Sequence, residues 1–169
     1  MIANTQILIL FLAVLLNAGC NKPDYHKVFV EKYGDENFDE FVNRSFFIRT
    51  SDREGNPIIY VFDETEQQAP CSMYFGVIVD RETRTVKSTI DDHLPDSCNI
   101  NKEASAELAV KFSTYGINRL TVDSNMNVFV MVKFKEGPED LVRFSDMKYK
   151  TEAYKDWKQV KGNWYEKKE

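Results

Sequence analysis

Short apolar runs that alternate with polar turns fill most of this chain, and this pattern favours a sheet built from hairpins. The runs are rich in Val, Ile, Phe and Tyr. The turns between them are rich in Asp, Asn, Gly and Pro, which suit tight backbone angles. The runs cover residues 45–50, 58–63, 73–79, 83–90, 117–122, 127–135, 141–144, 157–160 and 164–167. We therefore expect a twisted antiparallel sheet of about 6–8 strands.

Three segments instead carry apolar side chains at helical spacing. Residues 25–33 form one stripe, residues 38–42 add a further turn, and Asn101 is placed to cap a longer helix that ends near Tyr115. A central helix and N-terminal helices packed on one face of the sheet give an α+β domain. The same order of a helix before a meander is found in cystatin-like and NTF2-like folds, a likeness of fold that carries no function. No internal repeat is visible in the sequence.

The first residues are typical of an exported protein. Residues 1–19 carry no charged side chain, and Ile7–Leu16 is an unbroken apolar run of ten. Ten residues are too few to cross a bilayer as a helix, which takes about 20, but they match the apolar centre of a secretory signal. We therefore expect residues 1–19 to be a signal peptide.

The run Leu16-Asn17-Ala18-Gly19-Cys20 resembles the lipobox of bacterial lipoproteins. The family pattern is an aliphatic residue, two small residues and the cysteine that receives lipid. Ala18, Gly19 and Cys20 match this pattern, whereas Asn17 stands where the family has Leu, Val or Ile. The resemblance implies that Cys20 becomes the mature N-terminus and anchors the protein in the membrane, stably so if it carries two or more acyl chains.

The same resemblance divides the chain and suggests its location. Residues 20–24 become the lipidated cysteine and a short tether, and residues 25–169 a single α+β domain. Asn21, rather than Asp, follows the cysteine, which among enteric lipoproteins favours the outer membrane over the inner one. The alternative is an N-terminal core helix followed by a chance cysteine.

Charge and glycine content exclude several classes of function. The chain has 22 Lys and Arg against 27 Asp and Glu, a net charge of −5. Nucleic-acid binding needs a basic patch, so we expect no nucleic-acid partner. Glycine-rich loops for nucleotides need two or more glycines within about six positions. The seven glycines are all at least fifteen positions apart, so we expect no such cofactor, and no other cofactor is indicated.

Three cysteines remain to be assigned. If Cys20 carries lipid, Cys71 and Cys98 form a pair, and the oxidising compartment of an exported protein favours a disulfide between them. Two free thiols or a metal pair are the alternatives. Neither cysteine has the C-x-x-C neighbour that is usual in a zinc site.

The best candidate for catalysis or metal binding is the loop that contains Asp91, Asp92, His93 and Asp96. Adjacent carboxylates can bind a hard cation or share a proton, and an imidazole can act as a base near neutral pH. Neighbouring side chains diverge in an extended loop, however, and no second imidazole stands at ligand spacing. We therefore favour a solvated loop over a catalytic or metal site at these residues.

The C-terminal segment offers a candidate binding face. Tyr154, Trp157, Trp164 and Tyr165 stand among lysines, and large rigid aromatics give contact area at small entropic cost. The alternative, which weighs more, is that alternate aromatics pack on the sheet while the lysines protect an edge strand from aggregation.

These observations favour a membrane-anchored lipoprotein of the bacterial envelope. We expect a non-enzymatic module that binds a protein or another envelope component, and an inhibitor or immunity-type role would suit its size and acidity. One alternative is a hydrolase or metal-dependent enzyme that uses the loop Asp91–Asp96. Another is a small-ligand cup formed by a curved sheet around the central helix, for which a deep pocket with converging polar groups would argue.

Overall fold

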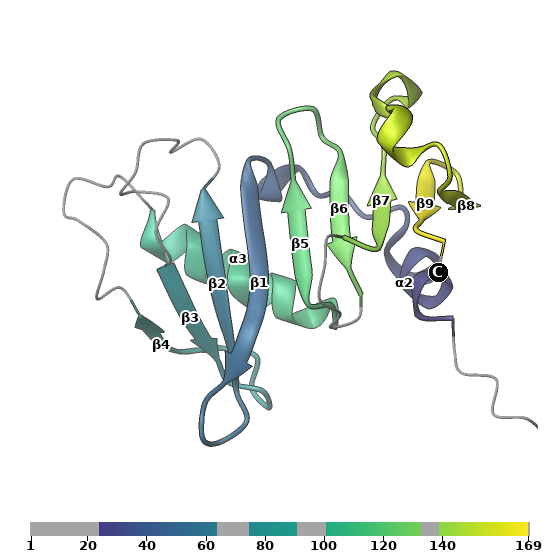
Figure 1. The fold of residues 1–169 in the computed structure, drawn as a ribbon. Helices are drawn as coiled ribbons and strands as arrows, with labels where there is room; N and C mark the ends of the chain where they lie inside the picture. The colour runs from purple at the N-terminus through teal and green to yellow at the C-terminus, as the bar shows by residue number, and fades with distance from the viewer. Residues whose placement is uncertain (1–23, 64–74, 91–100, 133–138, 169) are drawn as a thin grey trace, which may run out of the picture.

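The computed structural model describes residues 24–63, 75–90, 101–132 and 139–168. These residues form an α+β domain with one nine-stranded antiparallel sheet and two α-helices against one of its faces (Figure 1). The expected fold class is confirmed, and the sheet has more strands than expected. No helix within the described residues is long and apolar enough to span a membrane.

The strands lie in the order β4-β3-β2-β1-β5-β6-β7-β9-β8, and each neighbouring pair is antiparallel. In chain order the elements are α2 (Tyr25–Tyr33), the 3-10 turn η1 (Asp39–Phe41), β1 (Arg44–Ser51), β2 (Pro57–Asp63), β3 (Phe75–Val79), β4 (Val86–Ile90), α3 (Lys102–Thr114), β5 (Arg119–Val122), β6 (Val128–Met131), β7 (Leu141–Arg143), the 3-10 turns η2 (Met147–Tyr149) and η3 (Glu152–Tyr154), β8 (Lys158–Lys161) and β9 (Trp164–Glu166).

Local sequence signals account for the ends of the longer helix. The Asn101 side chain accepts a hydrogen bond from the backbone N–H of Ala104 at 3.0 Å, which caps α3 as expected. After Tyr115, Gly116 adopts a φ of 67°, a left-handed conformation that glycine reaches without strain and that ends the helix. The helical turn expected at 38–42 is present as the shorter 3-10 turn η1.

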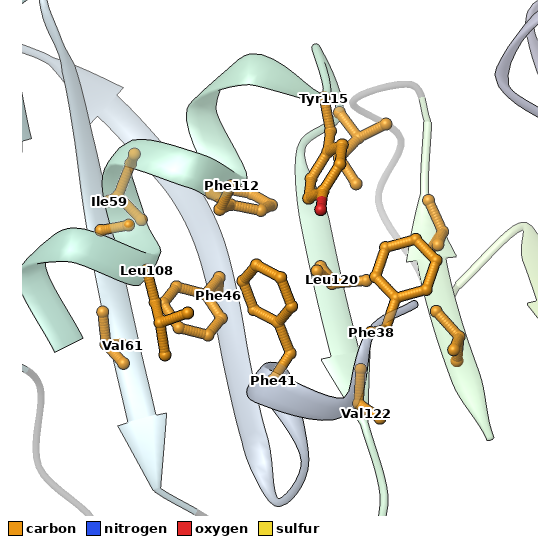
Figure 2. Close-up of a cluster of buried hydrophobic side chains, with 14 of the residues drawn as sticks. Phe38, Phe41, Phe46, Ile59, Val61, Leu108, Phe112, Tyr115, Leu120 and Val122 are labelled. Carbon is orange, nitrogen blue, oxygen red and sulfur yellow. The ribbon is translucent and has the colours of Figure 1, made fainter. Parts of the chain in front are cut away.

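The main core lies between the helices and the sheet (Figure 2). Phe46 of β1 and Phe112 of α3 are completely buried, with ring centroids 5.7 Å apart. Phe41 of η1 meets Phe46 edge to face at 5.3 Å, a favoured geometry for aromatic rings. Because these rings come from three separate elements, their packing holds η1 and α3 on the sheet.

The structure contains an internal repeat that the sequence does not reveal. Starting at the central β1–β5 pair, the order outward is β1, β2, β3 on one side and β5, β6, β7 on the other. The turn between β1 and β2 and the turn between β5 and β6 have the same construction. Asp52 Oδ1 accepts from the backbone N–H of Asn56 at 2.9 Å, and Asp123 Oδ1 accepts from that of Asn127 at 2.8 Å.

The two asparagines extend this likeness to the third strand of each half. Each side-chain amide donates to Oδ2 of its own aspartate, at 3.0 Å for Asn56 and 2.9 Å for Asn127. Each Oδ1 accepts a backbone N–H that follows the third strand, from Arg81 and from Ser145, both at 3.0 Å. Both asparagines are buried. Each therefore fastens its hairpin turn to the neighbouring strand.

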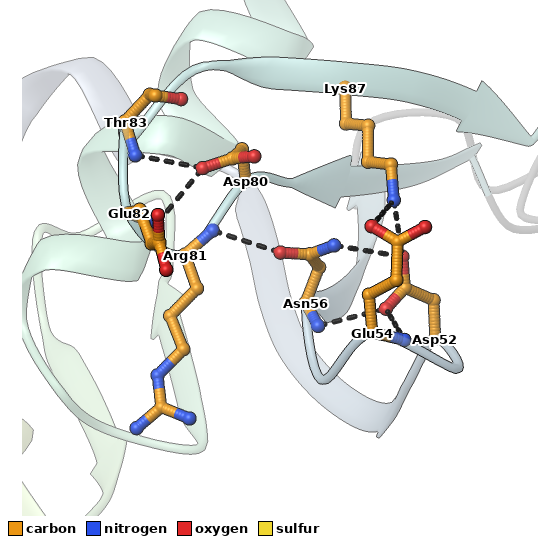
Figure 3. Close-up of polar contacts among 8 residues, drawn as sticks. All are labelled: Asp52, Glu54, Asn56, Asp80, Arg81, Glu82, Thr83 and Lys87. Carbon is orange, nitrogen blue, oxygen red and sulfur yellow. Dashed lines mark hydrogen bonds and ion pairs between the residues drawn. The ribbon is translucent and has the colours of Figure 1, made fainter.

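In the first half, charged side chains reinforce this junction (Figure 3). Lys87 Nζ lies 3.0 Å from Asp52 Oδ2 and 2.6 Å from Glu54 Oε2. Hydrogen bonds from Asn56, and then from Lys87 and the turn backbone, hold the pKa of Asp52 well below its ordinary range. In the next turn, Asp80 Oδ1 accepts from the backbone of Glu82 and Thr83, so β4 begins at Val86 and not at 83 as expected.

Candidate functional site

Several residues singled out in the sequence lie outside the described residues. These are Cys20, the cysteines Cys71 and Cys98, and the loop with Asp91, Asp92, His93 and Asp96. The lipid anchor, the disulfide and any chemistry of that loop therefore stay predictions.

The aromatic candidates Trp164 and Tyr165 do not form an exposed binding face. Successive residues of a strand point to opposite sides of the sheet, and here both sides are covered. Trp164 is 2% exposed in the main core, where its indole Nε1–H donates to Gly34 O at 3.1 Å. Tyr165 is 7% exposed and packs on Phe144 on the other face of the sheet, at 5.8 Å between ring centroids.

The other two aromatics belong to the same small cluster as Tyr165. Tyr154 meets Phe144 edge to face at 5.1 Å, and Trp157 meets Tyr154 at 5.0 Å; both are half-buried. The packing alternative for this segment therefore describes it better than an exposed recognition face.

A pocket of about 320 Å³ lies between the C-terminal end of α2 and the β8–β9 hairpin. Its lining consists of Gly34, Asp35, Arg143, Lys161, Gly162, Asn163 and Trp164. We call it the Arg143 pocket. Residues 34 and 143 are far apart in the sequence, and they meet because β7 pairs with β9 while α2 packs on Trp164.

Arg143 is the most constrained polar side chain of this pocket. Its guanidinium lies 5.1 Å from the ring centroid of Phe38 and 5.5 Å from that of Trp164, so it contacts two buried aromatic rings. Nη1 donates to Glu36 O at 2.9 Å. This is its only hydrogen bond to the part of the chain that the structure describes. Four of its five N–H donors are left for other partners.

Arg143 stays protonated although it is half-buried. Burial lowers the pKa of its guanidinium, and the negative charges of Asp39 and Asp35 act in the opposite direction. An arginine starts from so high a pKa that it stays charged in proteins. The pocket therefore contains a permanent positive charge that is only partly exposed to water.

Lys161 supplies a second positive charge at the mouth of the pocket. Its side chain is 58% exposed, and Nζ lies 3.8 Å from Asp35 Oδ2. Asp35 itself is 97% exposed, so this ion pair is screened by water and weak. The exposed Asn163 adds an amide to the same rim.

This lining suits the binding of an anion better than covalent catalysis. None of the seven residues is Ser, Thr, Cys, His or Tyr, the side chains that with Asp, Glu and Lys supply most protein nucleophiles. Its two remaining candidates, Asp35 and Lys161, are exposed and lie 3.8 Å apart as an ion pair, whereas a lysine nucleophile is activated by burial. Binding is therefore the chemistry that this lining supports best.

A second, more apolar groove of about 230 Å³ separates α2 from the end of α3. Tyr25 and Val28 of α2, which are 46% and 52% exposed, lie on one side of it. Tyr115 and Ile117 lie on the other side. The groove offers contact area, but its only charged lining residue is Lys32.

A cluster of titratable groups joins α2 to the last strand. Asp24, His26 and Glu166 each offer a potential metal-ligand atom, and these atoms lie within 4.8 Å of one another. Lys158 Nζ lies 2.9 Å from Glu166 Oε1, so a lysine already supplies the positive charge there that a metal ion would supply. His26 also contacts Asp140. We therefore interpret the cluster as an ion-pair network.

The sequence did not point to the Arg143 pocket or to the His26 cluster. Their members are separated by up to 142 positions, from Asp24 to Glu166, and no spacing pattern marks them. Comparison with known proteins adds no candidate, because no family model, no curated protein and no solved structure matches this chain. The function has to follow from the residues themselves.

Proposed function

We propose that this protein is a membrane-anchored lipoprotein of the bacterial cell envelope that acts as a non-enzymatic binding module. It recognises a protein or another envelope component and is held by Cys20, in the outer membrane rather than the inner one. The observation that carries the binding role is the Arg143 pocket. There a half-buried guanidinium keeps donors available beside an exposed lysine.

The anchor is supported by the resemblance of residues 16–20 to a lipobox. Only residues 21–24 separate the modified cysteine, Cys20, from α2, which begins at Tyr25. Such a short tether keeps the domain close to the membrane surface, so a partner has to lie in, on or near the same membrane.

Binding is favoured over catalysis by the chemistry of the described residues. The one histidine among them, His26, is engaged with Asp140 and Glu166 and lies outside the pocket lining. The rival proposal is an enzyme that uses the loop Asp91–Asp96. It predicts a hydrolytic or metal-dependent activity that His93→Ala abolishes, and no pocket residue supports it.

Mass spectrometry of the membrane fraction tests the anchor. The wild-type chain should carry acyl groups on Cys20, and Cys20→Ser should either leave the membrane fraction or retain an uncut signal. Asn17→Leu, which restores the family pattern, is the matched control and should be lipidated at least as fully as the wild type. A wild-type chain without lipid would overturn the anchoring proposal.

Affinity capture from envelope extracts tests the binding role. The full chain in detergent should retain an envelope component that Lys161→Glu, which reverses the charge at the pocket mouth, no longer retains. Lys155→Glu is the control, because Lys155 is equally exposed but pairs with Glu152 outside the pocket. Capture that is equal for wild type and Lys161→Glu would contradict a binding role for this pocket.

A further inference from the structure

We infer that the Arg143 pocket recognises a carboxylate group, either on an acidic residue or C-terminus of a peptide or on a small organic acid. This inference rests on the binding role proposed above and adds the chemical class of the ligand. It follows from the way the guanidinium is held, the balance of charge around it and the walls of the pocket.

The guanidinium is held before a ligand arrives. Contacts with the rings of Phe38 and Trp164 and the hydrogen bond to Glu36 O fix its position. A planar guanidinium presents paired N–H groups whose spacing matches the two oxygens of a carboxylate. Only one N–H of the guanidinium is engaged with Glu36 O, so a pair of N–H groups remains for a bidentate ligand. Because the side chain is already held in place, little of its conformational entropy is lost when a ligand binds.

The charge balance favours a monoanion over a dianion. Arg143 and Lys161 bring two positive charges, while Asp35 lies 3.8 Å from Lys161 and Asp39 also acts on Arg143. The two aspartates offset the two positive charges, so the lining has no excess positive charge to balance a dianion. They repel a doubly charged phosphate more strongly than a singly charged carboxylate, which can still pair directly with the guanidinium.

The walls suit a ligand with carbon atoms next to its charge. The indole Nε1–H of Trp164 is already bonded to Gly34 O, so the ring offers the pocket an apolar surface and no donor. The exposed Asn163 amide and Lys161 can contact polar atoms at the rim. A volume of about 320 Å³ is at the lower end for small-molecule sites, which suits a single acidic residue or a small acid.

NMR titration of the isotope-labelled full chain in detergent micelles tests this inference. The probes are N-acetylglycine, its uncharged amide and inorganic phosphate, and the reporter is the indole N–H of Trp164, assigned with Trp157→Phe. N-acetylglycine should shift this resonance in a saturable way, the amide should not, and phosphate should bind more weakly. An equal response to acid and amide, or tighter binding of phosphate, would overturn the inference.

Two variants connect the response to the pocket. Arg143→Lys keeps the charge but loses the planar fork, and should weaken N-acetylglycine binding about tenfold. Lys161→Gln changes an exposed residue, leaves folding intact and should weaken binding about twofold to threefold. Lys155→Gln is the control and should bind as the wild type does. Unchanged affinity in Lys161→Gln together with Arg143→Lys would place the carboxylate elsewhere and refute the proposal.

Further probes distinguish the sources of the carboxylate. A peptide with one internal Asp and blocked ends, a peptide with a free C-terminus and free succinate are compared at equal concentration. Preference for either peptide identifies a protein partner, and preference for succinate identifies a small acid. If the chain captures an envelope component through Lys161 but no probe binds, the carboxylate inference is wrong and the binding role stands. If neither capture nor probe binding is observed, the binding role and the carboxylate inference are both wrong.

Discussion

Nδ1 of His26, in the first turn of α2, lies 3.2 Å from Oε2 of Glu166 in β9, although 140 positions separate the two residues. On the other side of the imidazole, Nε2 lies 3.4 Å from Asp140 Oδ2, within ion-pair distance but not aligned as a hydrogen bond. The His26 ring therefore joins the start of the folded domain to its last strand through charge.

This contact makes the stability of the domain depend on pH. The pKa of His26 is raised above 6.5 by its contact with Asp140, against the effect of burial, and further by the charges of Asp140 and Glu166. Among the described residues, Lys158 and Asp24 also bring charges to this cluster. Because the folded state binds the imidazolium proton more tightly, the stabilisation is complete below the unfolded pKa of 6.5 and is lost as pH rises through the folded pKa.

Urea unfolding of wild type and His26→Gln across this range measures the effect. The wild type should have the larger free energy of unfolding on the acid side, and the difference should shrink as pH rises above the raised pKa. Lys27→Gln, an exposed change in the same helix, should show no such trend. A wild-type advantage that stays constant or grows with rising pH would contradict the ion-pair interpretation.

The repeated turns predict matched losses of stability. Asn56→Ala and Asn127→Ala each remove a buried amide that joins a turn aspartate to the neighbouring strand, and each should cost about 1–3 kcal/mol in chemical unfolding. The double variant should lose about the sum, because the two turns share no contacts. Asn125→Ala, at an exposed turn position, is the control and should be neutral. A loss at only one of the two sites would show that the turns are not equivalent.

The predicted Cys71–Cys98 disulfide can be tested in the oxidised protein. Under the disulfide interpretation, unfolded but unreduced protein has no titratable thiol at these positions. Closing a loop of 27 residues predicts that reduction lowers the free energy of unfolding by roughly 3–4 kcal/mol. The double variant Cys71→Ser, Cys98→Ser should be insensitive to reductant. Two free thiols in the oxidised protein would refute the disulfide and would make Cys98, five residues from His93, a candidate nucleophile.

The hairpins and the α3 cap could be predicted because they depend on residues close in sequence. Alternating apolar runs mark strands, and Asn101 caps the helix that directly follows it. The burial of Trp164 could not be predicted from neighbouring residues in this way. Alternation indicates that Trp164 and Tyr165 point to opposite faces, but only the packing of α2 and Phe144 determines that both faces are covered.

The Arg143 pocket and the repeat depend on contacts between distant segments. Arg143 contacts Phe38 only because β7 lies beside β9 and the segment after α2 crosses this end of the sheet. The main sequence signal of the repeat is an aspartate followed four residues later by an asparagine, which occurs in both turns, at Asp52 and Asn56 and at Asp123 and Asn127. Such short signals are common in ordinary hairpins, so they carry little weight until the strand order is known.

Photo-crosslinking in living cells, with a photoreactive residue in place of Asn163 at the rim of the Arg143 pocket, tests most directly whether the pocket binds an envelope component. The control has the same residue in place of Glu82, an exposed position near the opposite edge of the sheet. We expect a covalent adduct with an envelope component in the membrane fraction for position 163 and none for position 82. Lys161→Glu should abolish the adduct at position 163. No adduct at position 163, or an equal one at both positions, would contradict the proposal that this protein is a membrane-anchored binding module that acts through the Arg143 pocket.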